Sequence, residues 1–134
     1  MKKNLKNFEI ENIVAVLTHN NSFLKNISIK LPFEFRQAVR INLKTLTERV
    51  VVYEEENKET IQRYVDSGYA TDNGDGTINV KEEYRKTIVD ELNELSNVNN
   101  ELEIVTVDKT IVEKIKAMDI SMAEENVLDF FIAE

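Results

Sequence analysis

Residues 32–66 read PFEFRQAVRINLKTLTERVVVYEEENKETIQRYVD, and this stretch decides the fold. Pro32 suits the first turn of a helix, where a missing N–H costs no hydrogen bond. From there to about Asp66 the apolar residues recur every three or four positions, which predicts one long amphipathic helix. The apolar stripe consists of Phe35, Val39, Leu43, Leu46, Val50, Tyr53, Ile61 and Tyr64, with Asn57 in its polar slot.

A turn and a second helix follow this stretch. All three glycines of the chain lie between Ser67 and Thr77, and Asn73-Gly74 or Asp75-Gly76 between short β-compatible pieces predicts a small β-hairpin. From residue 81 to about residue 96 the pattern Tyr84, Ile88, Leu92, Leu95 is again helical. We therefore expect two antiparallel helices joined by a β-hairpin, with the stripes of 35–64 and 84–95 buried against each other.

Short elements flank this helical hairpin. Residues 10–17 fit a helix, whereas 26–30 and 101–107 alternate like strands, which predicts a two-stranded element formed by these two segments. The tract 97–100 between them and the second helix is expected to be a connector. Asp108 is a predicted N-cap for a helix through Lys116, and Ser121 with Glu124 forms a capping-box pattern for 122–132. The expected fold is a mostly helical α+β single domain over residues 1–134.

The composition excludes several classes of protein. The chain has 134 residues, no cysteine and a formal charge of −8, so disulfides, thiolate metal sites and cysteine nucleophiles are absent. Glu9, Glu11 and Asn12 interrupt the only stretch that resembles a signal peptide, and no apolar run is long enough to span a membrane. We expect a cytoplasmic protein without a cofactor.

The charge is unevenly distributed along the chain. Residues 1–31 carry +3, residues 32–100 carry −5 and residues 101–134 carry −6. Such a protein repels the nucleic-acid backbone, so direct nucleic-acid binding is not expected. An acidic surface instead favours a protein partner with a basic surface.

The segment 71–82 resembles the calcium loop of an EF-hand. Asn73 and Asp75 stand at the third and fifth ligand positions, Gly76 at the turn and Glu82 at the twelfth position. Thr71, however, replaces the Asp that opens such a loop, and no second loop is present to pair with it. The favoured interpretation is a hairpin tip whose Asp and Asn residues serve turn geometry; a calcium site remains the alternative.

No combination of residues predicts a catalytic site. His19 is the only histidine, and we expect it to end the first short helix and to interact with the last carbonyls there. Ser22, the nearest serine, lacks the sequence signature of an activated nucleophile. The chain is therefore not expected to be an enzyme.

The remaining charged clusters are expected to be solvated. Consecutive helical residues point in different directions, so Glu54, Glu55 and Glu56 cannot converge on one ion, and Glu59 belongs to the same acidic face. Glu124 and Glu125, near Asp129, are interpreted in the same way. Three cations, Arg36, Arg40 and Lys44, share one face of the long helix, where solvation is again the expected state and contact with an acidic partner is the alternative.

Two apolar groups have competing interpretations. Phe130 and Phe131 either form part of a terminal docking helix or, as we favour, Phe131 and Leu128 cover the core of the helical hairpin. Val51 and Val52 lie off the main stripe, where they would form a second contact face, so homo-oligomerisation stays open.

The order of these features resembles a family of small proteins with no known activity, encoded by phages and prophages of low-GC Gram-positive bacteria. The resembling features are the Ile29-Lys-Leu-Pro32 lead into the long helix, the charged hairpin, and a closing Asp119-Ile120-Ser121 followed by Glu124 through Ile132. The resemblance implies a phage origin and assigns no functional residue. The leading hypothesis is a phage-encoded, non-catalytic protein-binding protein, such as an acidic inhibitor of a host or defence nucleic-acid-binding protein; an accessory protein of virion or tail assembly is the alternative, as is a calcium-responsive module.

Overall fold

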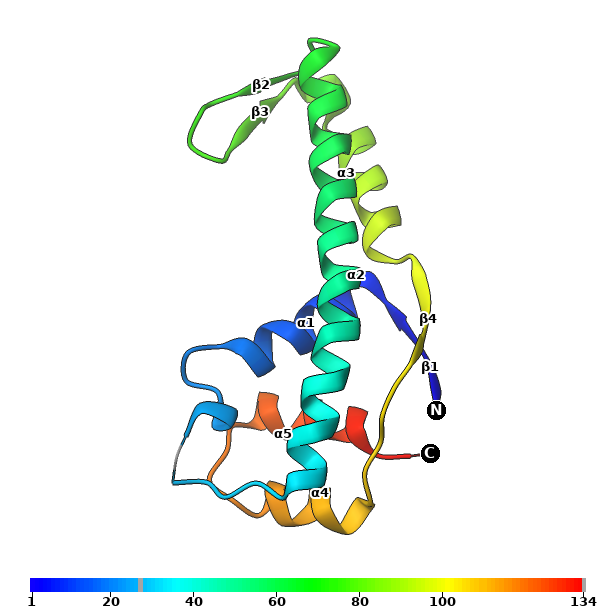
Figure 1. Cartoon of the computed structure of the whole chain (residues 1–134). Coiled ribbons are helices and arrows are strands. Elements are labelled where there is room, and N and C mark those ends of the chain that lie inside the picture. Colours follow the sequence, from blue (N-terminus) through cyan, green and yellow to red (C-terminus); the bar gives the residue numbers. More distant parts are fainter. Residues whose placement is uncertain (27, 134) are drawn as a thin grey trace.

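One long helix, α2 (Phe33–Asp66), runs through most of the length of the molecule in the computed structural model, which describes residues 1–26 and 28–133 (Figure 1). Pro32 precedes its first turn with φ −57° and ψ 147°, a conformation that the proline ring allows. Gly68 ends it with φ +79°, and its N–H donates to the carbonyl of Val65 at 3.0 Å. The predicted boundaries of the long helix are confirmed.

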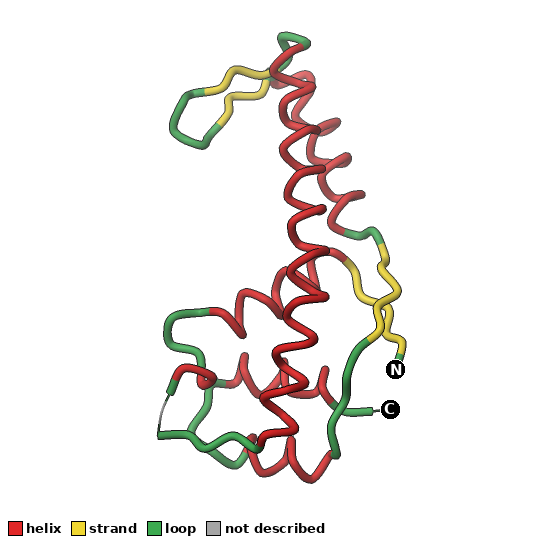
Figure 2. The backbone as a smooth tube through the Cα atoms, in the orientation of Figure 1, coloured by secondary structure: helices red, strands yellow, loops and turns green. Residues whose placement is uncertain are grey.

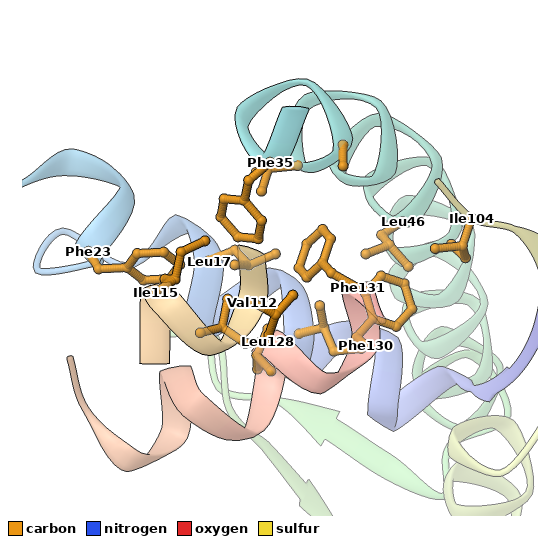
Figure 3. Close-up of a cluster of buried hydrophobic side chains, with 14 of the residues drawn as sticks. Leu17, Phe23, Phe35, Leu46, Ile104, Val112, Ile115, Leu128, Phe130 and Phe131 are labelled. Carbon is orange, nitrogen blue, oxygen red and sulfur yellow. The ribbon is translucent and has the colours of Figure 1, made fainter. Parts of the chain in front are cut away.

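The part of the chain outside residues 47–96, which we call the base, surrounds the first half of α2. It contains α1 (Asn7–Thr18), the 3₁₀ turn η1 (Phe23–Lys25), α4 (Lys109–Lys116), α5 (Met122–Leu128) and the 3₁₀ turn η2 (Asp129–Phe131). Their apolar faces form the larger core, in which Phe35 meets Phe131 edge to face with ring centroids 5.1 Å apart (Figure 3). The side chains buried most completely there are Phe35, Phe131, Ile10, Leu17, Leu46, Ile104, Ile115, Leu128 and Val112.

The second half of α2 forms a stalk with α3 (Glu82–Ser96), which returns alongside it (Figures 1 and 2). At the tip, β2 (Ala70–Asp72) and β3 (Ile78–Val80) form the antiparallel hairpin that the sequence predicts. A smaller core of Tyr64, Ala70 and Ile88, with partly buried neighbours, holds the stalk together. We call residues 47–96 the stalk.

The predicted helical hairpin is confirmed, but the apolar stripe of α2 contacts the apolar stripe of α3 over only part of its length. At about 1.5 Å per residue, α2 with 34 residues is about 51 Å long, whereas α3 with 15 residues is about 22 Å long. Helix α3 therefore covers only the part of the stripe near Ile61 and Tyr64. The part from Phe35 to Leu46 is buried instead by α1, α4, α5 and η2.

The predicted strand pairing is wrong. The strand β4 (Asn99–Glu103) pairs antiparallel with β1 (Lys2–Lys6) at the start of the chain, in the register Lys2↔Glu103 to Lys6↔Asn99. Residue 27 lies outside the described residues, and those around it form a turn in which the side-chain oxygen of Asn26 accepts the N–H of Ser28 at 2.9 Å. Such a local hydrogen bond competes with strand pairing. Part of the expected connector 97–100 is also strand, since β4 begins at Asn99.

Both predicted helix caps near the C-terminus are confirmed. The carboxylate of Asp108 accepts the N–H of Thr110 at 2.8 Å and begins α4. At α5 the Ser121 hydroxyl accepts the N–H of Glu124 at 3.2 Å, and the Glu124 carboxylate accepts the N–H of Ser121 at 3.1 Å. These reciprocal bonds form the capping box.

Candidate protein-interaction surface

The negative charge of the protein is concentrated on the stalk. Residues 47–96 hold thirteen acidic and six basic residues, a net charge of −7 out of the total of −8. The base is nearly neutral because the basic N-terminal segment and the acidic C-terminal segment lie together there. Lys2 contacts Glu101 at 3.2 Å, and the N-terminal ammonium contacts Glu103 at 3.1 Å.

The carboxylates on the outer face of α2 form an acidic ridge, which we define as Glu48, Glu55, Glu59 and Asp66. Their spacings of seven, four and seven residues place them on one side of the helix, opposite Tyr64, and all four are exposed. Asp66 lies 18 residues after Glu48, or about 27 Å along the helix axis. Within residues 1–26 and 28–133, Glu91 is the one stalk carboxylate in an ion pair, with Arg63 at 3.3 Å. The ridge is therefore available to a cationic partner.

Apolar side chains flank the acidic ridge. Val51 is 47% exposed and Val52 is 53% exposed, on either side of the ridge, and Ile41, on the part of α2 within the base, is 44% exposed. The prediction that the two valines lie off the buried stripe is confirmed. These side chains could add apolar contact area to a partner that binds the ridge.

The cluster of Glu54, Glu55, Glu56 and Glu59 is exposed, as predicted, whereas Glu124 is not. The Glu124 side chain is buried, and its second carboxylate oxygen accepts the N–H of Phe23 at 2.7 Å. The expectation of a solvated Glu124 is wrong because α5 packs against α1 and η1. This packing brings the Glu124 carboxylate to the backbone N–H of Phe23. Glu124 thus ties the start of α5 to η1.

His19 lies at the C-terminal end of α1, where it is exposed. Its Nδ1 accepts the N–H of Asn21 at 3.1 Å. The imidazole therefore bonds the turn that follows the helix, whereas the sequence predicted an interaction with the last carbonyls of the helix. A hollow of about 460 Å³ beside it is also lined by Ser22 and Glu124. The Ser22 hydroxyl accepts the N–H of Leu24 at 3.3 Å, so the polar groups of this hollow hold η1 and α5 in place.

The segment 71–82 uses its polar side chains within the hairpin tip. The carboxylate of Asp72 accepts the N–H of Gly74 at 2.8 Å, and that of Asp75 accepts the N–H of Thr77 at 3.0 Å. The hydrogen bond from the Thr77 hydroxyl also lowers the pKa of Asp75. Glu82 is the first residue of α3. Within the described part of the chain, no group of three His, Cys, Asp or Glu side chains is arranged to hold a metal ion.

These contacts disfavour the binding of calcium. We expect titration of the protein with Ca²⁺ up to millimolar concentration to release no heat of binding, because coordination would break the hydrogen bonds that the side-chain oxygens of Asn73 and Asp75 accept, and Thr71 offers no carboxylate. Isothermal titration calorimetry measures this directly. Saturable heat that disappears in Asp75→Asn would support the calcium alternative instead.

The aromatic residues near the C-terminus are core residues. Phe131 is fully buried and Phe130 is 8% exposed, with Lys3 Nζ 5.3 Å from the centre of the Phe130 ring. Phe131 and Leu128 belong to the core of the base, and not to that of the helical hairpin as predicted. Arg36, Arg40 and Lys44 are exposed, as expected.

Sequence reasoning missed a hollow at the tip of the stalk. It is lined by Tyr64, Tyr69 and Tyr84, which are three of the four tyrosines of the chain. The signal in the sequence was their position on both sides of the glycine-rich hairpin, which returns residue 84 to the neighbourhood of residue 64.

Comparison of the chain with models of protein families, with curated proteins and with solved structures gives no match. In the part of the chain that the structure describes, none of the helices has the length and apolar character that crossing a membrane requires.

Proposed function

We propose that this chain is a phage-encoded, non-catalytic protein-binding protein that acts in the host cytoplasm by docking its acidic stalk on a basic surface of a partner protein. The favoured partner is a host or defence protein that binds nucleic acid, which the stalk would inhibit. The observation that carries this proposal is the location of −7 of the net −8 charge on the protruding stalk. The phage origin follows the resemblance noted in the sequence.

The physical basis is electrostatic complementarity. A groove that binds nucleic acid presents clustered Lys and Arg side chains, and the acidic ridge offers carboxylates along about 27 Å of rigid helix. Opposite charge accelerates association and makes it sensitive to salt. Val51 and Val52 supply apolar contact area beside the charges. A protein partner would use this apolar area, whereas small counterions would not.

An accessory role in virion assembly is the second candidate. It is favoured by the exposed apolar residues Ile41, Val51 and Val52, which lie along α2 and offer a surface for packing between copies. The two candidates differ in the partner that the stalk should recover. A host nuclease or polymerase supports inhibition, and virion structural proteins support assembly.

Neutralisation of the ridge tests the proposal. We expect the triple variant Glu48→Gln, Glu55→Gln, Glu59→Gln to bind the partner at least about tenfold more weakly at 0.15 M salt, because three exposed carboxylates are removed without changing side-chain length. The measurement is affinity capture from infected cells, followed by surface plasmon resonance with the recovered protein. The association rate of the wild-type chain should fall as salt rises.

The matched control removes three exposed carboxylates from the base by Glu11→Gln, Glu113→Gln and Asp119→Asn. This variant has the same net charge as the ridge variant and should retain the affinity of the wild type. Equal losses in both variants would show that only overall charge matters. Unchanged binding by the ridge variant would contradict docking through the stalk.

A further inference from the structure

The hollow at the tip of the stalk lies where the end of α2, residues 67–69 and the start of α3 meet. It has a volume of about 460 Å³ and is lined by three tyrosines, Tyr64, Tyr69 and Tyr84, and by the charged residues Arg63, Asp66 and Glu91. Asp66 is also the last residue of the acidic ridge. The ridge therefore ends at the rim of the hollow, with Asp66 belonging to both.

The aromatic rings hold a defined arrangement. Tyr69 and Tyr84 are stacked, with ring centroids 3.9 Å apart and an interplanar angle of 17°. Tyr64 meets Tyr69 edge to face, with centroids 6.3 Å apart. Tyr64 is buried in the small core of the stalk, whereas Tyr69 is 38% exposed. The ring cluster is thus anchored in the small core through Tyr64 and partly exposed at Tyr69.

The charged groups make the hollow suitable for a cation. Glu91 accepts the hydroxyl of Tyr64 at 3.2 Å through one oxygen and Arg63 Nη2 at 3.3 Å through the other. Burial raises the pKa of Tyr64, and the bond to Glu91 raises it further, so its hydroxyl stays neutral and keeps donating. Asp66 accepts one bond, from Gln62 Nε2 at 2.7 Å. A carboxylate has more acceptor sites than this bond uses.

We propose that this hollow binds the guanidinium group of an arginine side chain of the partner protein. A planar guanidinium stacks on an aromatic face and donates in parallel to a carboxylate, and here the Tyr69–Tyr84 stack and Asp66 supply both elements. The two carboxylates of the lining outnumber its one cation, which disfavours an anion. Arg63 already shows that this lining accommodates a guanidinium beside Glu91.

This inference rests on the proposed function and deepens it. Tyrosine and arginine are the residues that dominate binding energy at interfaces, and they do so in preformed pockets. The ridge would attract the basic surface, and the tip would select an arginine on it. The partner is then recognised by one anchored side chain as well as by its overall charge.

The binding of small guanidinium compounds tests the site on the intact chain. We expect ethylguanidinium chloride to shift the amide resonances of Asp66, Tyr69 and Tyr84 in a ¹H–¹⁵N correlation spectrum, with a dissociation constant on the order of 10 mM. Ethylammonium chloride at equal ionic strength should bind at least about threefold more weakly because it cannot stack. Neutral ethylurea should not bind.

Variants separate the ring and the carboxylate from nonspecific charge. Tyr84→Phe keeps the stacked ring and should retain binding, whereas Tyr84→Leu and Asp66→Asn should each weaken it at least about fivefold. Asp90→Asn removes an exposed carboxylate of α3 outside the hollow and should leave binding unchanged. Shifts of equal size with ethylurea, shifts that persist in Asp66→Asn, or shifts centred on residues 48–59 would each overturn the proposal.

The failure of this site is distinguishable from the failure of the proposed function. If ethylguanidinium does not bind but the ridge variant loses the captured partner, docking through the stalk stands and the arginine site is wrong. If ethylguanidinium binds at the tip but no partner depends on the ridge, the site stands as a guanidinium site and the proposed docking is wrong.

Discussion

Replacement of Phe131 by alanine is expected to lower the free energy of unfolding by about 3–5 kcal/mol. Phe131 is fully buried between α2 and the C-terminal elements and contacts the rings of both Phe35 and Phe130. Truncation removes this apolar area and leaves a cavity that the surrounding helices fill only in part. A domain of this size is stabilised by about 5–15 kcal/mol, so the loss is a large share of the total.

Urea denaturation followed by circular dichroism measures the effect of Phe131→Ala. The matched control is Phe33→Ala on α2, where the ring is 65% exposed, and this variant should stay within about 0.5 kcal/mol of the wild type. Similar stability of both variants would show that Phe131 is not a core residue. It would revive the interpretation of the C-terminal segment as a docking element.

Asn42→Ala is the second substitution with a large expected effect, about 2–3 kcal/mol. The Asn42 side chain is fully buried in α2 and forms two hydrogen bonds with the backbone of Val105: Nδ2 donates to the carbonyl at 2.8 Å, and Oδ1 accepts the N–H at 2.8 Å. These bonds attach the segment after β4 to the long helix. Alanine leaves both backbone groups without their partner.

Thermal or urea unfolding measures the stability of the Asn42 variant, and amide hydrogen exchange locates the defect. We expect the N–H of Val105 to exchange faster in Asn42→Ala because its acceptor is removed. Asn12→Ala, at an exposed position in α1, serves as the control and should change stability by less than about 0.5 kcal/mol. Normal protection of Val105 in Asn42→Ala would contradict the assigned role.

The elements with strong local signals were predictable from the sequence. The stripe from Phe35 to Tyr64 marked α2, the glycines at 68–76 marked the hairpin, and Ser121 with Glu124 marked the start of α5. In each case residues close in sequence interact with one another. The stripe alone, however, did not indicate which helices cover each of its parts.

The pairing of distant segments was not predictable in the same way. The sequence expectation joined 26–30 to 101–107, whereas Lys2–Lys6 is the strand that pairs with β4. A five-residue strand with two half-buried side chains has a weak pattern, and its basic residues resembled the start of a signal peptide. Glu124 was mistaken for a solvated residue for a related reason, since its partner, the N–H of Phe23, is 101 residues away.

Local periodicity thus determined which residues are helical and which face of α2 is apolar, because these properties depend on neighbours within one or two turns. The tertiary structure alone decided where the charge lies. Along the sequence both residues 47–96, with −7, and residues 101–134, with −6, are strongly acidic, but the latter fold onto the +3 of residues 1–31 in the base. The stalk keeps its carboxylates exposed because two helices that bury only a small core between them leave the outer faces of both to the solvent.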